Sequence, residues 1–231
     1  MSILIDWHSH VLPGIDDGSQ FLEESLGLLE KEAEQGVNRV IATPHFYAQY
    51  DQPEVFLEKR SQVAALLRKA AAQHLGFPEI RLGAEVYFFR GMGRSDLLPK
   101  LAIEGTDYVL VEMPQPPWTE DMYRELEEIR AYHGLTPIIA HIDRYIEPFH
   151  TYGIPQKLET MPVRVQANAS FFLNRRTKNM ALKMVKKGQI HLLGSDCHNL
   201  TTRPPRLGQA LTVLLRAGIR QGTDGLLMRV E

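Results

Sequence analysis

Seven short apolar runs recur along the chain, separated by longer stretches in which apolar residues repeat every three or four positions. Continuous apolar runs of about four to eight residues are typical of strands buried on both faces, as in parallel sheets. They cover residues 3–7, 37–42, 80–85, 108–112, 136–140, 163–167 and 190–194. The amphipathic stretches between them predict helices over residues 21–35, 53–75, 121–133, 175–187 and 205–217.

This alternation of strand and helix predicts an α/β fold. We prefer a closed or nearly closed barrel with right-handed crossovers, and periodicity leaves an open doubly wound sheet as the alternative. No linker, repeat or low-complexity tract divides the chain, so residues 1–231 are expected to form a single domain. Residues 218–231 have weak patterning, and we expect a loosely packed tail there.

Composition narrows the possible function classes. The chain has 26 Lys and Arg, 28 Asp and Glu and a formal net charge of -2, which argues against a nucleic-acid groove or an anionic membrane surface as its target. No window approaches about 18 consecutive apolar residues, so no membrane insertion is expected, and the start lacks the features of a signal peptide. Cys197 is the single cysteine, which excludes an internal disulfide framework. The sequence therefore predicts a soluble, cytoplasmic protein.

Polar residues of one chemical kind stand where the apolar runs end. The ends of six runs carry eight imidazole or carboxylate side chains, namely His8, His10, His45, Glu85, Glu112, His141, Asp196 and His198. In a parallel barrel the carboxyl ends of all strands lie on one face. Because residues two apart in an extended segment point the same way, His8 and His10 are both able to face one ion.

Each of these residues alone has a simpler explanation, since a lone histidine at a strand end is more often structural and a lone carboxylate often caps a helix. Helix capping does not explain why eight such residues stand at the mouth of one barrel. Ionised carboxylates at the ends of apolar strands are also costly unless they are paired or bound to a metal. Imidazoles with carboxylates and no thiolate favour Zn, Mn or Fe. The set exceeds the needs of one ion, so we predict two or three ions with a bridging carboxylate.

Two arginines follow the predicted ligands. Arg144 lies three positions after His141, and Arg203 lies five after His198. Either alone is explained equally well as surface charge. Beside a polynuclear centre, paired guanidinium groups suit a tetrahedral oxyanion, which they grip with two hydrogen bonds each. Metals with arginines indicate hydrolysis of phosphate esters rather than deamination or amide cleavage.

At this point the motifs resemble a known family. The segment DWHSHVLPGIDDG at residues 6–18 resembles the opening of the polymerase and histidinol phosphatase (PHP) superfamily, and more narrowly of bacterial PHP-type protein-tyrosine phosphatases from capsule and exopolysaccharide gene clusters. Further matches lie at residues 42–45, 83–85, 140–145, 194–199 and 203–204, in the expected order. The resemblance implies a distorted (β/α)7 barrel and three divalent ions, usually manganese.

The resemblance also implies a ligand assignment. The first ion is bound by His8, His10, Glu85 and Asp196. Glu85 bridges to a second ion, which Glu112 and His141 complete. The third ion is bound by Asp17, His45 and His198. The family often has Glu at the position of Asp143, which is not a ligand in the pattern.

The implied reaction is in-line attack of a metal-activated hydroxide on phosphotyrosine, without a phosphoenzyme. Arg144 and Arg203 match the family's phosphate-binding arginines, and His198 or a metal-bound water helps to protonate the leaving tyrosine. The implied substrate is a phosphotyrosyl protein, a bacterial tyrosine kinase of polysaccharide export. Two alternatives stay open: a small-molecule phosphatase such as histidinol-phosphate phosphatase, and a metal-stabilised regulatory module that binds the kinase without turnover.

Cys197 and Arg203 suggest a rival mechanism, because they have the Cys-x5-Arg spacing of thiol-based tyrosine phosphatases. The segment between them contains no glycine to turn backbone amides inward, and neighbouring Asp196 opposes a low thiol pKa. We expect the spacing to be coincidental.

Aromatic residues follow two of the predicted ligands. Phe46, Tyr47 and Tyr50 follow His45, and residues 114–118 with Trp118 follow Glu112. They are either an aromatic rim that receives a tyrosine ring or loop residues packed on the barrel.

Overall fold

The computed structural model describes residues 3–146 and 150–229. Its strands are β1 (Ile5–Ser9), β2 (Arg39–Ala42), β3 (His45–Phe46), β4 (Glu79–Leu82), β5 (Glu85–Tyr87), β6 (Tyr108–Glu112), β7 (Thr136–Ile139), β8 (Arg164–Asn168), β9 (Leu192–Gly194), β10 (Ile219–Gln221) and β11 (Leu227–Arg229). Its helices are α1 (Leu22–Glu34), α2 (Pro53–Ala71), α3 (Leu98–Leu101), α4 (Glu120–His133), α5 (Ile154–Leu158), α6 (Ala169–Leu173), α7 (Lys178–Lys186) and α8 (Leu207–Arg216), with short 3-10 turns at Met92–Arg94 and Ile142–Arg144.

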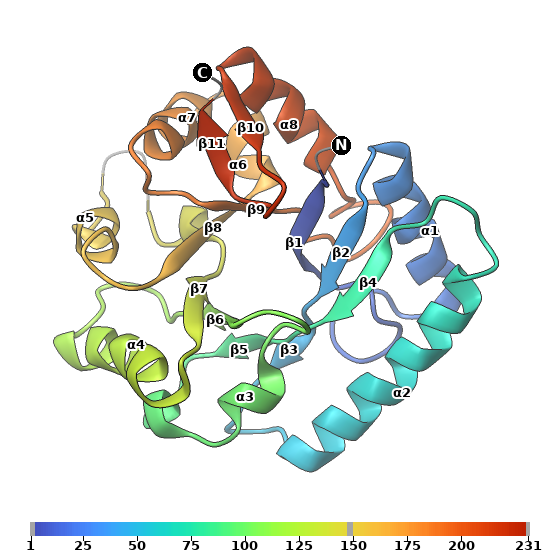
Figure 1. Cartoon of the computed structure of the whole chain (residues 1–231), viewed down its shortest axis with the longest axis horizontal. Coiled ribbons are helices and arrows are strands. Elements are labelled where there is room, and N and C mark those ends of the chain that lie inside the picture. The colour runs from blue at the N-terminus through green and yellow to red at the C-terminus, as the bar shows by residue number, and fades with distance from the viewer. Residues whose placement is uncertain (1–2, 147–149, 230–231) are drawn as a thin grey trace.

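The strands form a ring of parallel neighbours in chain order. One sheet has the order β1-β2-β4 and a second the order β3-β5-β6-β7-β8-β9. β3 continues β2 and β5 continues β4 after two intervening residues, and the ring closes where Ser9 after His8 bridges to Cys197 after β9. Helices surround the ring on its outside (Figure 1). The predicted distorted seven-stranded barrel is confirmed, because the strand order has no switch point of the kind a doubly wound sheet requires.

One predicted strand is interrupted, and another is followed by a short strand that was not predicted. The run at 80–85 is split into β4 and β5, and β3 was not predicted after the run at 37–42. Pro44, which lacks a backbone N–H, lies in the two-residue break between β2 and β3. The amide of Gly83 donates to the carbonyl of Ala42 at 2.9 Å, and that of Glu85 to Pro44 at 3.0 Å, so the divided strands stay aligned.

Two apolar layers hold the barrel. A small cluster fills its interior, made of Ile5, Trp7, Ile41, Ile103, Leu110, Ile138, Ala140 and Leu192. A larger one packs the outer faces of the strands against the helices. Since alternate residues of a strand face opposite ways, strands with continuous apolar sequence supply both layers. The five long helices predicted from amphipathic spacing are all present with ends shifted by a few residues.

An irregularity in β1 redirects the first predicted ligand. The register of β1 against β2 shifts between Asp6 and Ser9. The Asp6 carboxylate accepts hydrogen bonds from the amide of His8 at 3.2 Å and of Ser195 at 2.8 Å. As a result Trp7 lies in the interior cluster while its neighbour His8 reaches the mouth, a re-aiming that bulges commonly produce beside active sites.

The expectation of a loosely packed tail was wrong for the described part of residues 218–231. β10 and β11 pair as an antiparallel hairpin. The buried side chain of Gln221 accepts from the amide of Ile5 at 2.9 Å and donates to its carbonyl at 3.0 Å, and Trp7 donates to the carbonyl of Gly225. Strands of three residues are too short to leave a periodic pattern, so tertiary contacts decide their structure. Residues 230–231 lie outside the described residues.

Across the described ranges, no helix is both long and apolar enough to span a bilayer. That residues 1–231 act as a single domain stays a prediction.

Candidate metal centre

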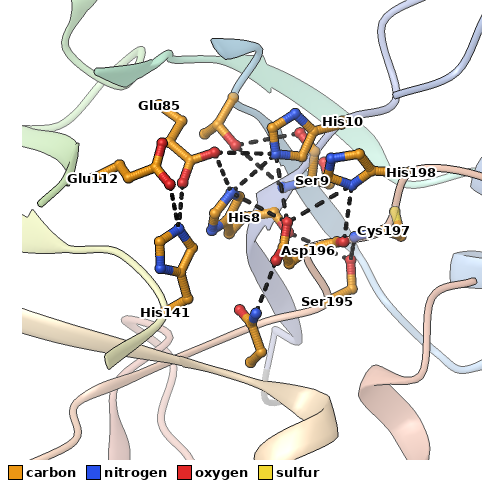
Figure 2. A network of polar contacts seen from close by, with 12 residues as sticks. His8, Ser9, His10, Glu85, Glu112, His141, Ser195, Asp196, Cys197 and His198 are labelled. Carbon is orange, nitrogen blue, oxygen red and sulfur yellow. Dashed lines mark hydrogen bonds and ion pairs between the residues drawn. The ribbon is translucent and has the colours of Figure 1, made fainter. Parts of the chain in front are cut away.

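Four side chains converge on one point at the carboxyl ends of the strands (Figure 2). Nε2 of His8 lies 3.1 Å from Nε2 of His10 and 3.1 Å from Oε2 of Glu85. Oδ1 of Asp196 lies 3.6 Å from Nε2 of His8 and 3.5 Å from that of His10. All four residues are buried. Two imidazoles and two carboxylates that meet at one point are a ligand set for one cation.

Hydrogen bonds on the far side of each ring orient the two imidazoles. Nδ1 of His10 lies 2.7 Å from Oδ2 of Asp16, and Nδ1 of His8 lies 3.2 Å from Oε1 of Gln166. Because both oxygens are acceptors, each Nδ1 donates a hydrogen bond and each Nε2 faces the shared point. The same Gln166 oxygen accepts the backbone N–H of His141 at 2.6 Å, which fixes the orientation of the amide.

Glu85 also faces a second group of ligands. Its Oε1 lies 2.7 Å from Nε2 of His141, and Oε1 of Glu112 lies 3.5 Å from the same nitrogen. Nδ1 of His45 lies 3.1 Å from Oε2 of Glu85. Glu85 therefore presents one oxygen to His8 and the other to His141, as a carboxylate that bridges two cations does.

A third group lies on the solvent side. Oδ1 of Asp17 is 3.4 Å from Nε2 of His45 and 3.3 Å from Nε2 of His198. His10 completes this group, whose ligating atoms all lie within 4.8 Å of one another. The loop turns tightly because residue 18 is glycine: a Cβ on Gly18 would lie 2.3 Å from the carbonyl oxygen of His10. Every predicted ligand thus lies within one contiguous cluster.

Several atoms that face the cluster are buried and make no hydrogen bond to the described residues. They are Nδ1 of His45, Oδ1 of Asp196 and Nε2 of His198. Buried polar atoms that make no hydrogen bond are costly. Divalent cations satisfy such atoms, and imidazoles with carboxylates suit Zn, Mn or Fe. The residues present therefore fit a metal centre.

Electrostatics favour the ligating forms of Glu85 and His198 but not that of His10. Burial by itself raises the pKa of the Glu85 carboxyl, but the facing imidazoles of His8, His10 and His141 hold it well below its ordinary value. Burial and the neighbouring His10 lower the pKa of His198 to about 4. For His10, burial lowers the pKa but the Asp16 and Glu85 carboxylates raise it to about 10. Cation binding at His10 therefore releases a proton.

Two predicted ligands occupy backbone conformations that L-residues rarely adopt. The φ angle is 31° at His141 and 52° at Asp196, each just beyond its strand. Such residues cost about 1–3 kcal/mol and concentrate at functional sites. The amide of Asp196 donates to the carbonyl of His8 at 2.8 Å, and that of His141 donates to Gln166, so the surrounding structure holds both turns. Gly194 permits the close approach, because a Cβ there would lie 2.6 Å from Cβ of His8.

Both predicted arginines lie over the cluster. Nη2 of Arg144 lies 2.6 Å from Oδ2 of Asp196, and Nη2 of Arg203 lies 2.8 Å from Oδ1. Nη1 of Arg144 lies 3.6 Å from Oε1 of Glu112. Their side chains are 36% and 37% exposed, so each has one side against the cluster and the other toward solvent. They are thus placed to bind an anion that approaches the centre from outside.

The sequence interpretation missed three residues that hold the ligands. Asp16 orients His10, Gln166 orients His8, and Nδ2 of Asn168 donates to Oδ2 of Asp196 at 2.8 Å. A signal did exist for Gln166 and Asn168, because both are polar and lie two apart at the end of the predicted strand 163–167, so they face the same way.

The structure argues against a thiol mechanism. Cys197 is fully buried, and burial, reinforced by the nearby Glu32 and Asp6 carboxyls, raises the pKa of its thiol well above the ordinary value. The amides of residues 201–203 donate to Oδ1 of Asn199, at 3.0, 2.8 and 3.1 Å, and so do not form a phosphate cradle. The Cys-x5-Arg spacing is coincidental.

Only part of the suggested aromatic rim lies near the centre. Phe46 is fully buried, and Trp118 packs against Tyr145 with ring centroids 5.0 Å apart. The loop-packing interpretation holds for these two. Tyr47 instead stacks on His45 with a centroid distance of 5.4 Å, and Tyr50, 87% exposed, lies beside it.

Comparisons with known proteins agree with this geometry. Tyrosine-protein phosphatase YwqE of Bacillus subtilis is 30% identical over 224 residues, which cover 91% of this chain and 84% of the relative. Tyrosine-protein phosphatase CpsB of Streptococcus agalactiae serotype III is 29% identical over 228 residues, with 92% and 90% covered.

Among solved structures, those of YwqE from Bacillus subtilis and CpsB from Streptococcus pneumoniae, described as unique metal-dependent tyrosine phosphatases, match with a TM-score of 0.75 at 24% identity. The match covers 92% of this chain and 87% of the other, and establishes the barrel fold. The resemblance identified from the sequence is confirmed. Because the sequence model for capsular polysaccharide synthesis, CpsB/CapC, matches residues 4–229, this chain belongs to the CpsB/CapC family.

Proposed function

We propose that this protein is a metal-dependent protein-tyrosine phosphatase, a phosphoric monoester hydrolase that acts on phosphotyrosyl proteins. Its relatives named as tyrosine-protein phosphatases cover nearly its whole length. The observation that carries the proposal is the position of Arg144 and Arg203, which lie on opposite oxygens of Asp196 above a cluster of nine imidazole and carboxylate residues. Such a site binds a dianionic phosphate beside divalent cations.

Three divalent cations, with manganese expected and iron or zinc as alternatives, match the three groups of ligating atoms. The proposed sets are His8, His10, Glu85 and Asp196 for the first, Glu85, Glu112 and His141 for the second, and Asp17, His45 and His198 for the third. Support comes from the short distances within each set and from the buried atoms that lack hydrogen bonds.

Bound divalent cations lower the pKa of a coordinated water to roughly 7 and neutralise phosphoryl oxygens. The protein's own groups then orient the substrate. Arg144 and Arg203 bind the equatorial oxygens and stabilise the charge that develops on them. His198, with a pKa of about 4, is neutral at neutral pH, which favours its role as a ligand over a role as proton donor to the leaving tyrosine. The exposed Tyr50 and the stacked Tyr47 offer a surface for the substrate ring.

The proposed partner is a bacterial tyrosine kinase of polysaccharide export, since the family belongs to capsular polysaccharide synthesis. A cytoplasmic location is part of the proposal, because such a kinase would present its phosphotyrosines there and the single cysteine forms no internal disulfide.

One assay tests the proposal. The chelator-treated protein is incubated with a phosphotyrosyl peptide and with histidinol phosphate, each with and without added Mn²⁺. Release of phosphate from the peptide that requires Mn²⁺ is the expected result. Preference for histidinol phosphate would favour the small-molecule phosphatase, and absence of any turnover at full metal occupancy would favour the non-catalytic module.

A further inference from the structure

A groove leads away from the metal centre along α6. A cavity of about 310 Å³ is lined by Asp196, Arg144 and Arg203 at one end and by Arg206 at the other. A second cavity of about 500 Å³ continues past Arg206 toward Thr177. Both are lined by Asp143, Ser170 and Arg206, so they form one continuous groove whose middle carries Arg206.

The charges in this groove are not balanced. Arg144 and Arg203 each form an ion pair with Asp196. Arg206 is exposed and forms no ion pair or side-chain hydrogen bond with any residue of the described ranges. The other carboxylate of the groove, Asp143, accepts the amide of Asn168 at 2.9 Å and forms no ion pair with Arg206. Arg206 is therefore the cationic group of the groove that is free to bind an anion.

The distance from the centre suits a peptide. Arg206 lies three positions after Arg203, so their Cα atoms are at most roughly 11 Å apart. An extended peptide advances roughly 3.3–3.6 Å per residue. When a phosphotyrosine binds Arg144 and Arg203, side chains within about three positions of it in the substrate lie along the groove beside Arg206.

We infer that Arg206 is a specificity-determining residue that binds an acidic side chain close to the phosphotyrosine of the substrate. The inference rests on the proposed phosphatase activity and adds a sequence preference to it. An exposed guanidinium–carboxylate pair contributes modestly, so the preference is about threefold to tenfold in kcat/KM.

The test compares phosphotyrosyl peptides that differ in one residue, Glu or Gln, placed one to three positions before or after the phosphotyrosine. The holoenzyme should prefer Glu at one of these positions, and Arg206→Ala should bring the Glu-to-Gln ratio of kcat/KM to about one. Arg206→Lys should retain part of the preference. Arg216→Ala removes an exposed arginine at the far end of α8 and serves as the control that keeps the wild-type ratio.

Charge reversal separates recognition from a structural effect. Arg206→Glu should favour a peptide with Lys at the same position, and higher salt should weaken both preferences because exposed pairs are screened. An equal ratio in wild type and Arg206→Ala, or no inversion in Arg206→Glu, would overturn the inference while leaving phosphatase activity in place. Failure of the wild-type holoenzyme to hydrolyse any of the peptides would instead remove the proposed function, and the inference with it.

Discussion

Nε2 of His8 and Nε2 of His10 lie 3.1 Å apart and face the same point. They do so although β1 is irregular here, with a register shift between Asp6 and Ser9. The Asp6 carboxylate accepts the amide of His8 and so holds the irregular turn. Two ring nitrogens at this distance require either a shared proton or a cation between them. The neighbouring Glu85 and Asp196 carboxylates favour the cation.

Asp16 should tune metal affinity without contacting the ion. Its Oδ2 accepts from Nδ1 of His10 at 2.7 Å and from the amide of His45 at 3.0 Å. Asp16→Asn removes the charge that makes the His10 ring a better ligand, so we expect Mn²⁺ affinity to fall about 10- to 100-fold. Calorimetric titration of the metal-free protein measures it. Asp121→Asn, at an exposed position of α4, is the control, and an unchanged dissociation constant for Asp16→Asn would contradict the prediction.

Arg144 and Arg203 should act on the transition state. Arg144→Ala is expected to lower kcat/KM by about 10²- to 10³-fold, equivalent to roughly 2.7–4 kcal/mol, as for other lost oxyanion donors. Arg144→Lys should recover only part, because lysine lacks the planar fork. Since both arginines also contact Asp196, metal content must be measured by atomic emission in each variant. Arg176→Ala, at an exposed site, is the control, and a loss below tenfold in fully loaded Arg144→Ala would exclude a catalytic role.

Cys197 should be dispensable. Its thiol is buried and its pKa is raised, so at neutral pH it is neither ionised nor accessible. Cys197→Ser and Cys197→Ala should retain turnover within about threefold of wild type once loaded with metal, and the native protein should resist iodoacetamide over hours. Mass spectrometry of the alkylated protein checks the second point. Loss of activity in both variants with the fold intact would restore the thiol mechanism.

Glu32 should make stability depend on pH. Burial raises the pKa of this carboxyl well above its ordinary value of 4.5, and the adjacent Asp6 raises it further. The folded protein therefore keeps a proton that the unfolded chain releases above pH 4.5. Between pH 4.5 and the folded-state pKa, the free energy of unfolding falls as the pH rises. The decrease is at most roughly 1.4 kcal/mol per pH unit.

Glu32→Gln removes that titration and keeps the length and shape of the side chain. Its melting temperature relative to wild type should therefore rise between pH 5 and pH 8, as thermal denaturation monitored by circular dichroism would detect. Glu30→Gln, exposed on the same helix, is the matched control. A constant offset for Glu32→Gln would mean that Glu32 is ionised in the folded protein.

Much of the site follows from sequence alone. The spacing of His8 and His10, and the positions of Glu85, His141 and Asp196 at the ends of apolar runs, predicted one cluster because parallel strands of a barrel all end on one face. Helix periodicity located the long helices for a similar reason, since an amphipathic stripe is a local property of the sequence. Ligand roles within the cluster stay a prediction.

Only the tertiary structure decided the features that depend on contacts between distant residues. Gln166 orients His8 from 158 positions away, and Gln221 pairs with Ile5 from 216 positions away. Neither contact leaves a periodic pattern in the sequence, because a hydrogen bond made by one side chain requires no repeated spacing. The groove at Arg206 likewise exists only where the turn at Ile142–Arg144, α6 and the segment before α8 meet. The shape and the unpaired charge of a surface arise from packing and not from residue order.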